Sequence, residues 1–302
     1  MLSPRYHLVT IVAIFLALGL GLLAGSSFGQ PTLVGQLQER TEAQLRRIEE
    51  LRDEVDVERA RAEALASYAS ASAPFLVAGR LEGYRALVVT QEGVPSALET
   101  AVLGALEASG AEVLATFAAQ PALTGADAAD AAALTALLGP AGPGEETATA
   151  VRAGALLAGR LASAASPLDP EADPITDLLR GGFLAARDGA LDEPIRLEMH
   201  ATRFIVVVLG GTDPDADPLA TRPFAESLVA TLADAGVPVA AVEADAAGDA
   251  WVAQVAADSA ITVVGADGPA GTVALILGLL ERIRTGDGGA YGGERAPLPA
   301  LP

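Results

Sequence analysis

The chain of 302 residues contains no cysteine and no lysine, only two histidines and few aromatic residues. The absence of cysteine excludes disulfide bonds, thiolate metal ligands and cysteine nucleophiles, and it suits an oxidising compartment. Aromatic residues make up 4% of the chain, so the rings that commonly line deep ligand pockets are scarce. These absences favour a protein whose function depends on neither thiol chemistry nor a large substrate pocket.

Positive charge is also scarce, since 19 arginines stand against 39 aspartates and glutamates and give a formal net charge of −20. Such a surface repels phosphate backbones and anionic lipid headgroups, and the sequence shows no basic patch that could offset the repulsion. We therefore expect no nucleic acid partner. The hydrophobic content of 51% is nevertheless ample for a packed core.

Residues 8–28 form an apolar run without a charged residue. Its length is close to the ~20 residues that a helix needs to cross a hydrocarbon core of about 30 Å, so it predicts a transmembrane helix. The alternative is a cleaved signal peptide, for which Ala24-Gly25-Ser26 offers a small-residue cleavage site. The long apolar run and the helix-forming segment that follows favour the uncleaved anchor.

The basic residues around this segment predict its orientation. Arg5 precedes it, and the first basic residue after it is Arg40. Because positive charge is retained inside, residues 1–7 should be cytoplasmic and the rest of the chain should lie outside the cytoplasm, anchored to the cell membrane by a single span.

Small residues recur every four positions in the predicted span and would share one helix face, as they do in membrane dimers with small-xxx-small motifs. This predicted transmembrane dimer face consists of Ala13, Ala17, Gly21 and Gly25. Alanine and glycine are common in such helices, so the motif favours a dimer only in combination with other features.

Residues 31–73 are rich in charged, helix-favouring residues and predict a coiled-coil stalk. Apolar residues occupy seven of the heptad a and d positions, whereas Thr41, Gln44 and Glu58 occupy the others. The predicted seam consists of Val34, Leu37, Ile48, Leu51, Val55, Ala62 and Leu65. It favours a parallel homodimer or a coiled coil with another envelope protein, although an amphipathic helix packed on its own domain is the alternative.

Residues 81–284 alternate between apolar strands and helical segments and predict an exported α/β domain. Because the strands are continuously apolar, we expect a mostly parallel sheet with helices on both faces. Predicted strands are 86–90, 112–117, 204–209, 237–242 and 261–264, and predicted helices are 95–109, 218–235 and 272–284. Residues 126–190 appear as an alanine-rich helical stretch, and the tail 285–302 is expected to be disordered.

The similarity of ALEASGAEVLATF to TLADAGVPVAAVE indicates an internal duplication of a βαβ element. Each predicted helix of the pair ends at a glycine, Gly110 or Gly236, as helices commonly do.

Candidate chemistry is sparse in this sequence. Met199 and His200 are adjacent and would point to opposite faces of a strand, so they would not readily share a metal ion. The segment Gly210-Gly211-Thr212 lacks the glycine pattern of a dinucleotide site and the lysine of a phosphate-binding loop, which favours a tight turn. Asp213, Asp215 and Asp217 fit a solvated turn better than a calcium site. No cofactor is evident, and we expect no enzymatic activity.

Several segments resemble the actinobacterial MctB copper-transport family. They are RYHLV at residues 5–9, AIFLALGLGLLAGS at 13–26, the strand 86–90, ALEASGAEV at 105–113 and Tyr291-Gly292. The resemblance covers the whole chain and implies a role in exporting copper or limiting its accumulation. It is carried by apolar, structural motifs, and no copper ligand of the family can be placed on this sequence.

The chain is also similar to SteB, a membrane-anchored coiled-coil protein of cell separation. This second resemblance implies a partner of the SteA type and activation of a peptidoglycan hydrolase by the exported coil. It requires no metal, and it uses the small-residue face and the stalk that the sequence displays.

Overall fold

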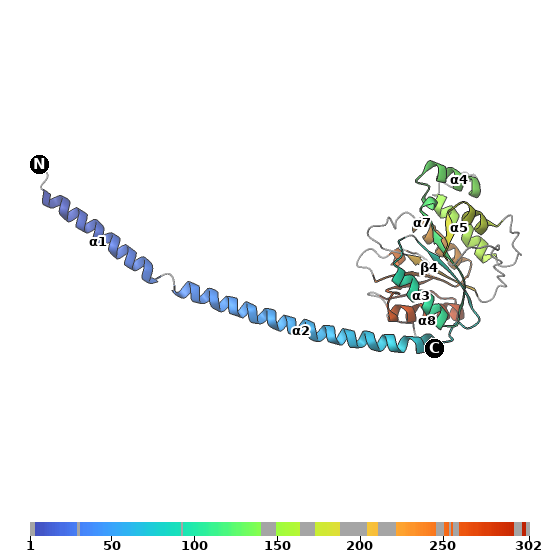
Figure 1. Cartoon of the computed structure of the whole chain (residues 1–302), viewed down its shortest axis with the longest axis horizontal. Helices are drawn as coiled ribbons and strands as arrows, with labels where there is room; N and C mark the ends of the chain where they lie inside the picture. The colour runs from blue at the N-terminus through green and yellow to red at the C-terminus, as the bar shows by residue number, and fades with distance from the viewer. Residues whose placement is uncertain are drawn as a thin grey trace. The chain divides into compact units, whose positions relative to one another are not determined.

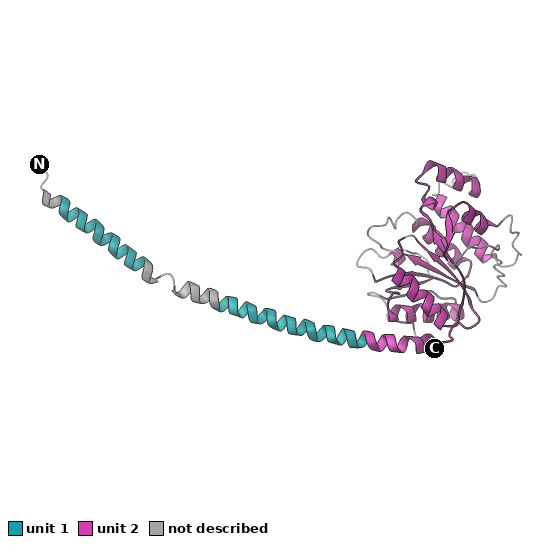
Figure 2. Ribbon diagram, viewed as in Figure 1, with its two compact units in different colours: residues 1–65 teal, residues 66–302 magenta. Residues whose placement is uncertain are grey.

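The computed structural model of the chain describes residues 4–28, 31–91, 93–139, 149–163, 173–187, 204–210, 222–245, 251–253, 255, 260–292 and 298–299. The chain divides into two compact units, residues 1–65 and 66–302 (Figure 2).

The first unit consists of helix α1, Pro4–Phe28, and most of helix α2, Pro31–Val77. Within α1, the 19 residues His7–Gly25 have a mean hydropathy of 2.6, and this apolar segment is not buried against the rest of the protein. By length and composition this helix can cross a membrane. The start of α2 at Pro31 agrees with the preference of proline for the first turn of a helix.

The second unit is built on a seven-stranded sheet with the order β3-β2-β1-β4-β5-β6-β7. All neighbouring strands are parallel except β2 and β3, which are antiparallel. The strands are β1 Arg85–Thr90, β2 Glu112–Ala119, β3 Leu184–Ala186, β4 Phe204–Gly210, β5 Val239–Glu243, β6 Ile261–Val264 and β7 Gly289–Tyr291. The predicted fold class, a mostly parallel sheet in an α/β domain with one N-terminal apolar helix, is confirmed.

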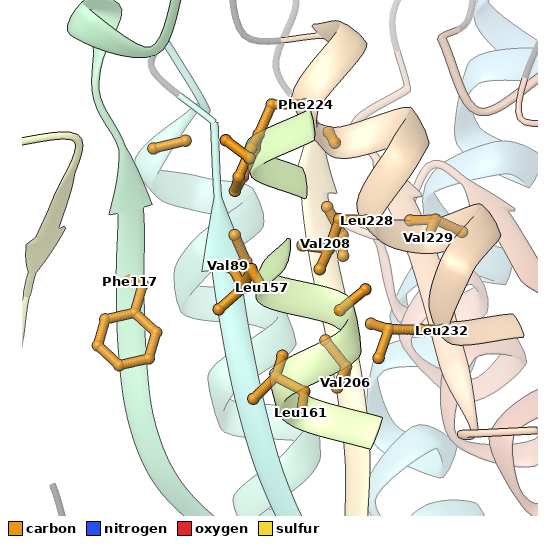
Figure 3. Close-up of a cluster of buried hydrophobic side chains, with 14 of the residues drawn as sticks. Val89, Phe117, Leu157, Leu161, Val206, Val208, Phe224, Leu228, Val229 and Leu232 are labelled. Atoms are coloured by element: carbon orange, nitrogen blue, oxygen red, sulfur yellow. The ribbon is translucent and has the colours of Figure 1, made fainter. Parts of the chain in front are cut away.

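Helices cover both faces of this sheet and enclose two cores (Figure 1). One face packs against α5, Thr149–Ala162, and α7, Arg222–Asp234, with α4, Ala128–Leu138, and α6, Pro174–Arg180, alongside. Figure 3 shows the centre of this core, where Val89, Val206 and Val208 of the strands meet Leu157, Leu161, Leu228 and Leu232 of the helices.

The other face packs against α3, Ser96–Ala108, α8, Pro269–Thr285, and the last turn of α2, where Val77 is buried. Two short 3-10 helices, η1 Pro121–Thr124 and η2 Trp251–Ala253, complete the described elements. The sheet is therefore shielded from water on both sides, which explains why its strands are apolar at nearly every position.

The strand order places a topological switch point between β1 and β4. From there, β1-α3-β2 leads to one side of the sheet and β4-α7-β5 leads to the other, and the two helices cover opposite faces. Two right-handed crossovers that diverge from a common centre require this arrangement. The predicted βαβ elements thus occupy equivalent places, whereas the duplication itself stays a prediction.

The structure differs from the sequence predictions at both edges of the sheet. The tail predicted to be disordered from residue 285 contains β7, which pairs with β6 and buries Tyr291, so that prediction is wrong for Gly289–Tyr291. The stretch 126–190, expected to be helical, contains α4, α5 and α6 but also the strand β3. Both missed strands have only three residues, too few to show a hydropathy pattern.

Candidate functional site

The predicted coiled-coil seam lies on helix α2 and is exposed to solvent. Ile48, Leu51 and Val55 are 45%, 43% and 46% exposed, and Leu65 is 70% exposed. Ala62 is exposed as well, whereas Val34 and Leu37 lie in α2 with side chains outside the described set. Most helical stability in proteins comes from packing of an apolar face, and the described part of this seam has no such packing within the chain.

Three ion pairs lie along α2, and one of them includes Glu58 at a d position. They join Arg47 to Glu50 at 3.2 Å, Arg59 to Asp56 at 3.8 Å and Arg61 to Glu58 at 2.5 Å. Each pair lies within one helix and is more than 60% exposed, so it contributes only a few tenths of a kcal/mol, about 0.3–0.5. These pairs give α2 a polar side but cannot replace the missing packing of its apolar side.

The predicted transmembrane dimer face is also unpartnered within the described residues of this chain. Ala13, Ala17, Gly21 and Gly25 all lie in α1 and are exposed. A Cβ atom added at Gly21 or Gly25 would meet no atom within 4 Å. The backbone of α1 is therefore open to close approach by another helix at this face.

A row of residues crosses the carboxyl edge of the sheet at the switch point. Gln91 directly follows Thr90, which pairs with Leu209, and Gly210 pairs with Glu243. Because side chains alternate along strands, Gln91, Gly210 and Glu243 lie on the sheet face that carries α5 and α7. Ligands of α/β sheets commonly bind at this edge.

Buried polar groups occupy this row. A Cβ atom at residue 210 would overlap the indole of Trp251, so the glycine leaves the space that the ring nitrogen fills. Gln91 is 2% exposed and Trp251 is 4% exposed, and Gln91 Nε2 and Trp251 Nε1 have no hydrogen-bond partner among the described residues. The backbone N–H of Val252 donates to Glu243 Oε2 at 3.3 Å.

Two N–H donors beside a buried carboxylate suit hydrogen bonding to a hydroxyl group or to water. Of this row, only Gly210 was singled out from the sequence, and it was interpreted as part of a tight turn. The sequence feature that could have indicated the other members is a polar residue directly after an apolar predicted strand. Gln91 and Glu243 both stand at such a position.

The described residues hold no group of three or more histidine, cysteine, aspartate or glutamate side chains that could bind a metal ion. Met199, His200, Gly211, Thr212, Asp213, Asp215 and Asp217 lie outside the described residues. Within the described part of the chain, therefore, the structure offers exposed apolar helix surfaces and one buried polar row as its candidate sites.

Comparison with known proteins finds a family match over the whole chain. A family model with the description "Copper transport outer membrane protein, MctB" matches residues 1–302. No curated protein matches the chain. The match includes both helical segments of the first unit as well as the α/β domain.

Proposed function

This chain belongs to the MctB family of copper transport proteins, and from that premise we propose that it limits copper accumulation as a non-enzymatic, dimeric coiled-coil protein of the cell envelope. The family match carries the connection to copper. The exposed seam of α2 supports the dimer, since Ile48, Leu51 and Val55 have no covering partner among the described residues. Because these residues are already about half covered in the single helix, burying each of them against a second helix contributes less than the ~1.5–3 kcal/mol gained when a fully exposed side chain is buried.

In this proposal copper is the substrate that other envelope proteins transport, and it is not a resident cofactor of this chain. The described residues contain no metal-binding cluster, so we propose that the chain assembles or positions other envelope proteins that handle the metal. Among the described residues, one helix is long and apolar enough to cross a membrane, and such a helix is suited to anchoring and to pairing.

We further propose that α1 anchors the chain in the cell membrane with its N-terminus in the cytoplasm. The flanking charges support this orientation, since Arg5 precedes the apolar segment. The α/β domain would then lie outside the cytoplasm. The family description names the outer membrane, and membrane fractionation distinguishes the two locations.

The proposal is tested by measuring cellular copper after deletion of the gene and complementation with variants. Deletion should raise copper content and copper sensitivity, and the wild-type chain should restore both. Leu51→Asp, which places a charge in the seam, should fail to restore them. Ala60→Asp is the matched control, because it adds the same charge at an exposed position of α2 outside the seam.

Unchanged copper content in the deletion strain would refute the copper role. Full rescue by Leu51→Asp at normal expression would refute the dependence on the coiled coil. Failure of Ala60→Asp would show that any added charge on α2 is harmful, which would also count against the seam.

The exposed seam favours a second candidate function, a SteB-like scaffold for cell separation. Polar residues at core positions, Gln44 and Glu58, suit pairing with a different helix that carries complementary groups. In this case a membrane partner of the SteA type and a peptidoglycan hydrolase would bind the chain. Deletion would then leave cells joined in chains at normal copper content.

A further inference from the structure

A shallow apolar groove of about 270 Å³ lies within the second unit, between the last turns of α2, helix α3 and the start of α8. Its lining includes Ser70, Ala73 and Val77 of α2, Gly104 and Ala108 of α3, and Thr272 of α8. A Cβ atom added at Gly104 would meet no atom within 4 Å, so the groove is open at this point. Small side chains thus leave a hollow beside the end of α2.

An exposed aromatic side chain lies near this groove on the same helix. Tyr68 is 74% exposed, although its ring is large and mostly apolar. Tyr68 and Ala73 are five positions apart, which corresponds to about 140° around a helix with 3.6 residues per turn. The ring therefore points away from the groove of its own chain.

The heptad register of the seam relates the two features in a dimer. With Ile48, Val55 and Ala62 at a positions, Tyr68 takes a g position and Ala73 takes an e position. In a parallel two-stranded coil, a g residue of one helix lies beside the e residue of the following heptad on the partner. Tyr68 of one copy is thereby placed beside Ala73 of the other, at the rim of the groove.

We propose that the groove is an interface with a second copy of this chain and that it receives the partner's Tyr68. This inference rests on the proposed coiled-coil dimer and identifies where that dimer engages the α/β domain. The apolar part of the ring covers Ala73, Gly104 and Ala108. The groove lining also includes hydroxyls of Ser70 and Thr272, which suit the phenol oxygen.

Two-fold symmetry makes the contact occur twice, since each copy supplies one ring and one groove. The seam then continues past Leu65, its last predicted residue, into contacts with α3 and α8. A change in the pairing of the two α2 helices would therefore also change the contacts of α3 and α8, which cover one face of the sheet.

The absence of cysteine makes disulfide crosslinking of the full chain in membranes a clean test. The double variant Tyr68→Cys/Ala73→Cys should form a covalent dimer on mild oxidation. Tyr68→Cys/Glu63→Cys is the matched control, because its cysteines are also five positions apart while Glu63 lies outside the seam. Leu65→Cys, at a d position, reports on the coiled coil alone.

Crosslinking of Leu65→Cys and of the 68/73 pair, without crosslinking of the 68/63 control, is the expected result. Crosslinking at Leu65→Cys with no excess of the 68/73 pair over the control would overturn the groove contact and leave the dimer intact. No crosslinking at either place would overturn the dimer and the groove contact together.

A substitution that fills the groove tests whether the partner's Tyr68 binds inside it or only lies near it. In detergent-solubilised full chain, Tyr68→Ala should weaken dimerisation about tenfold or more, as loss of a buried aromatic anchor does. Gly104→Leu should weaken it in the wild-type background but add little in the Tyr68→Ala background, as measured by sedimentation. Additive effects of the two substitutions would contradict occupation of the groove by Tyr68.

Discussion

Tyr291 is a buried residue of strand β7 whose ionisation depends on the fold. Its hydroxyl donates a hydrogen bond to Glu281 Oε2 at 3.1 Å. Burial, together with the hydrogen bond to Glu281 and its negative charge, raises the pKa of Tyr291 from 10.0 to about 12. The folded chain therefore keeps the phenol proton over a pH range in which the unfolded chain releases it.

This pKa shift predicts a loss of stability at alkaline pH. Since the folded-state pKa is the higher one, the contribution of Tyr291 is fully present below about pH 10 and is lost as the pH rises towards 12. Tyr291→Phe should remove this part of the pH dependence, as measured by urea unfolding across that range. Tyr6→Phe, in α1 and outside the α/β domain, is the control and should leave the pH dependence of the unfolding of that domain unchanged.

Ultraviolet titration of tyrosinate provides an independent measurement. Wild-type chain should show a phenol component that titrates near pH 12, and Tyr291→Phe should lose that component. Identical titration curves for the two proteins would contradict the assignment. Burial and the hydrogen bond to Glu281 would then have too little effect on the pKa of Tyr291 to influence stability.

The polar row at the carboxyl edge of the sheet is a spatial grouping of residues that the sequence alone does not predict. Gln91, Gly210 and Glu243 come from strands that are distant along the chain, and only the register of β1, β4 and β5 places them side by side. The overlap of a Cβ atom at residue 210 with Trp251 depends on tertiary packing as well. Local patterns contain no information on either relation.

At the scale of elements, close packing of α5 against α7 depends on Gly154. A Cβ atom added there would clash with the carbonyl oxygen of Phe224 and lie 3.1 Å from the backbone nitrogen of Leu228. Nearby, the hydroxyl of Ser227 donates to the carbonyl of Val151 at 2.7 Å and joins the two helices. The backbones of α5 and α7 are therefore in close contact at Gly154.

We predict that Gly154→Ala destabilises the α/β domain by about 1–3 kcal/mol, because the two helices must move apart. Gly159→Ala on the same helix is the control, since a Cβ atom there meets nothing within 4 Å. It should be neutral or stabilising by up to about 1 kcal/mol, as alanine favours helix over glycine. Chemical unfolding measures both, and equal effects of the two substitutions would refute the packing argument.

The longer elements of this fold were predictable from the sequence, and the reason is physical. Strands such as 86–90 and 204–209 are apolar because both sheet faces are covered, so their runs stand out against the helices between them. Strands β3 and β7 were missed because edge strands of three residues owe their structure to a neighbouring strand rather than to their own composition. The strand order followed from no local pattern.

At the scale of the whole molecule, family membership and residue chemistry give different kinds of information. The family match connects all 302 residues with copper transport, whereas the described residues display no metal-binding cluster. Large apolar side chains of α1 and α2 are exposed, and the proposed contacts with other proteins use these faces. The proposed role in assembly is compatible with both observations, because it does not require copper to bind to the described residues.

The orientation of α1 in the membrane determines on which side the α/β domain lies. Because the sequence contains no cysteine, introduced cysteines can test this orientation directly. Ser3→Cys places a thiol before α1, and Glu63→Cys places one on α2. In intact spheroplasts, a membrane-impermeant maleimide should label Glu63→Cys and should label Ser3→Cys only after permeabilisation. This outcome follows from Arg5 being retained in the cytoplasm.

Labelling of Ser3→Cys in intact spheroplasts, with protection of Glu63→Cys, would reverse the topology and place the α/β domain in the cytoplasm. The mass of the mature chain addresses the remaining alternative. Cleavage after the small residues Ala24-Gly25-Ser26 would remove α1 and with it the transmembrane dimer face. A full-length mass together with protected Ser3→Cys is the result that an uncleaved, signal-anchored stalk requires, because a chain cleaved after α1 would have lost both its membrane anchor and the residues before it.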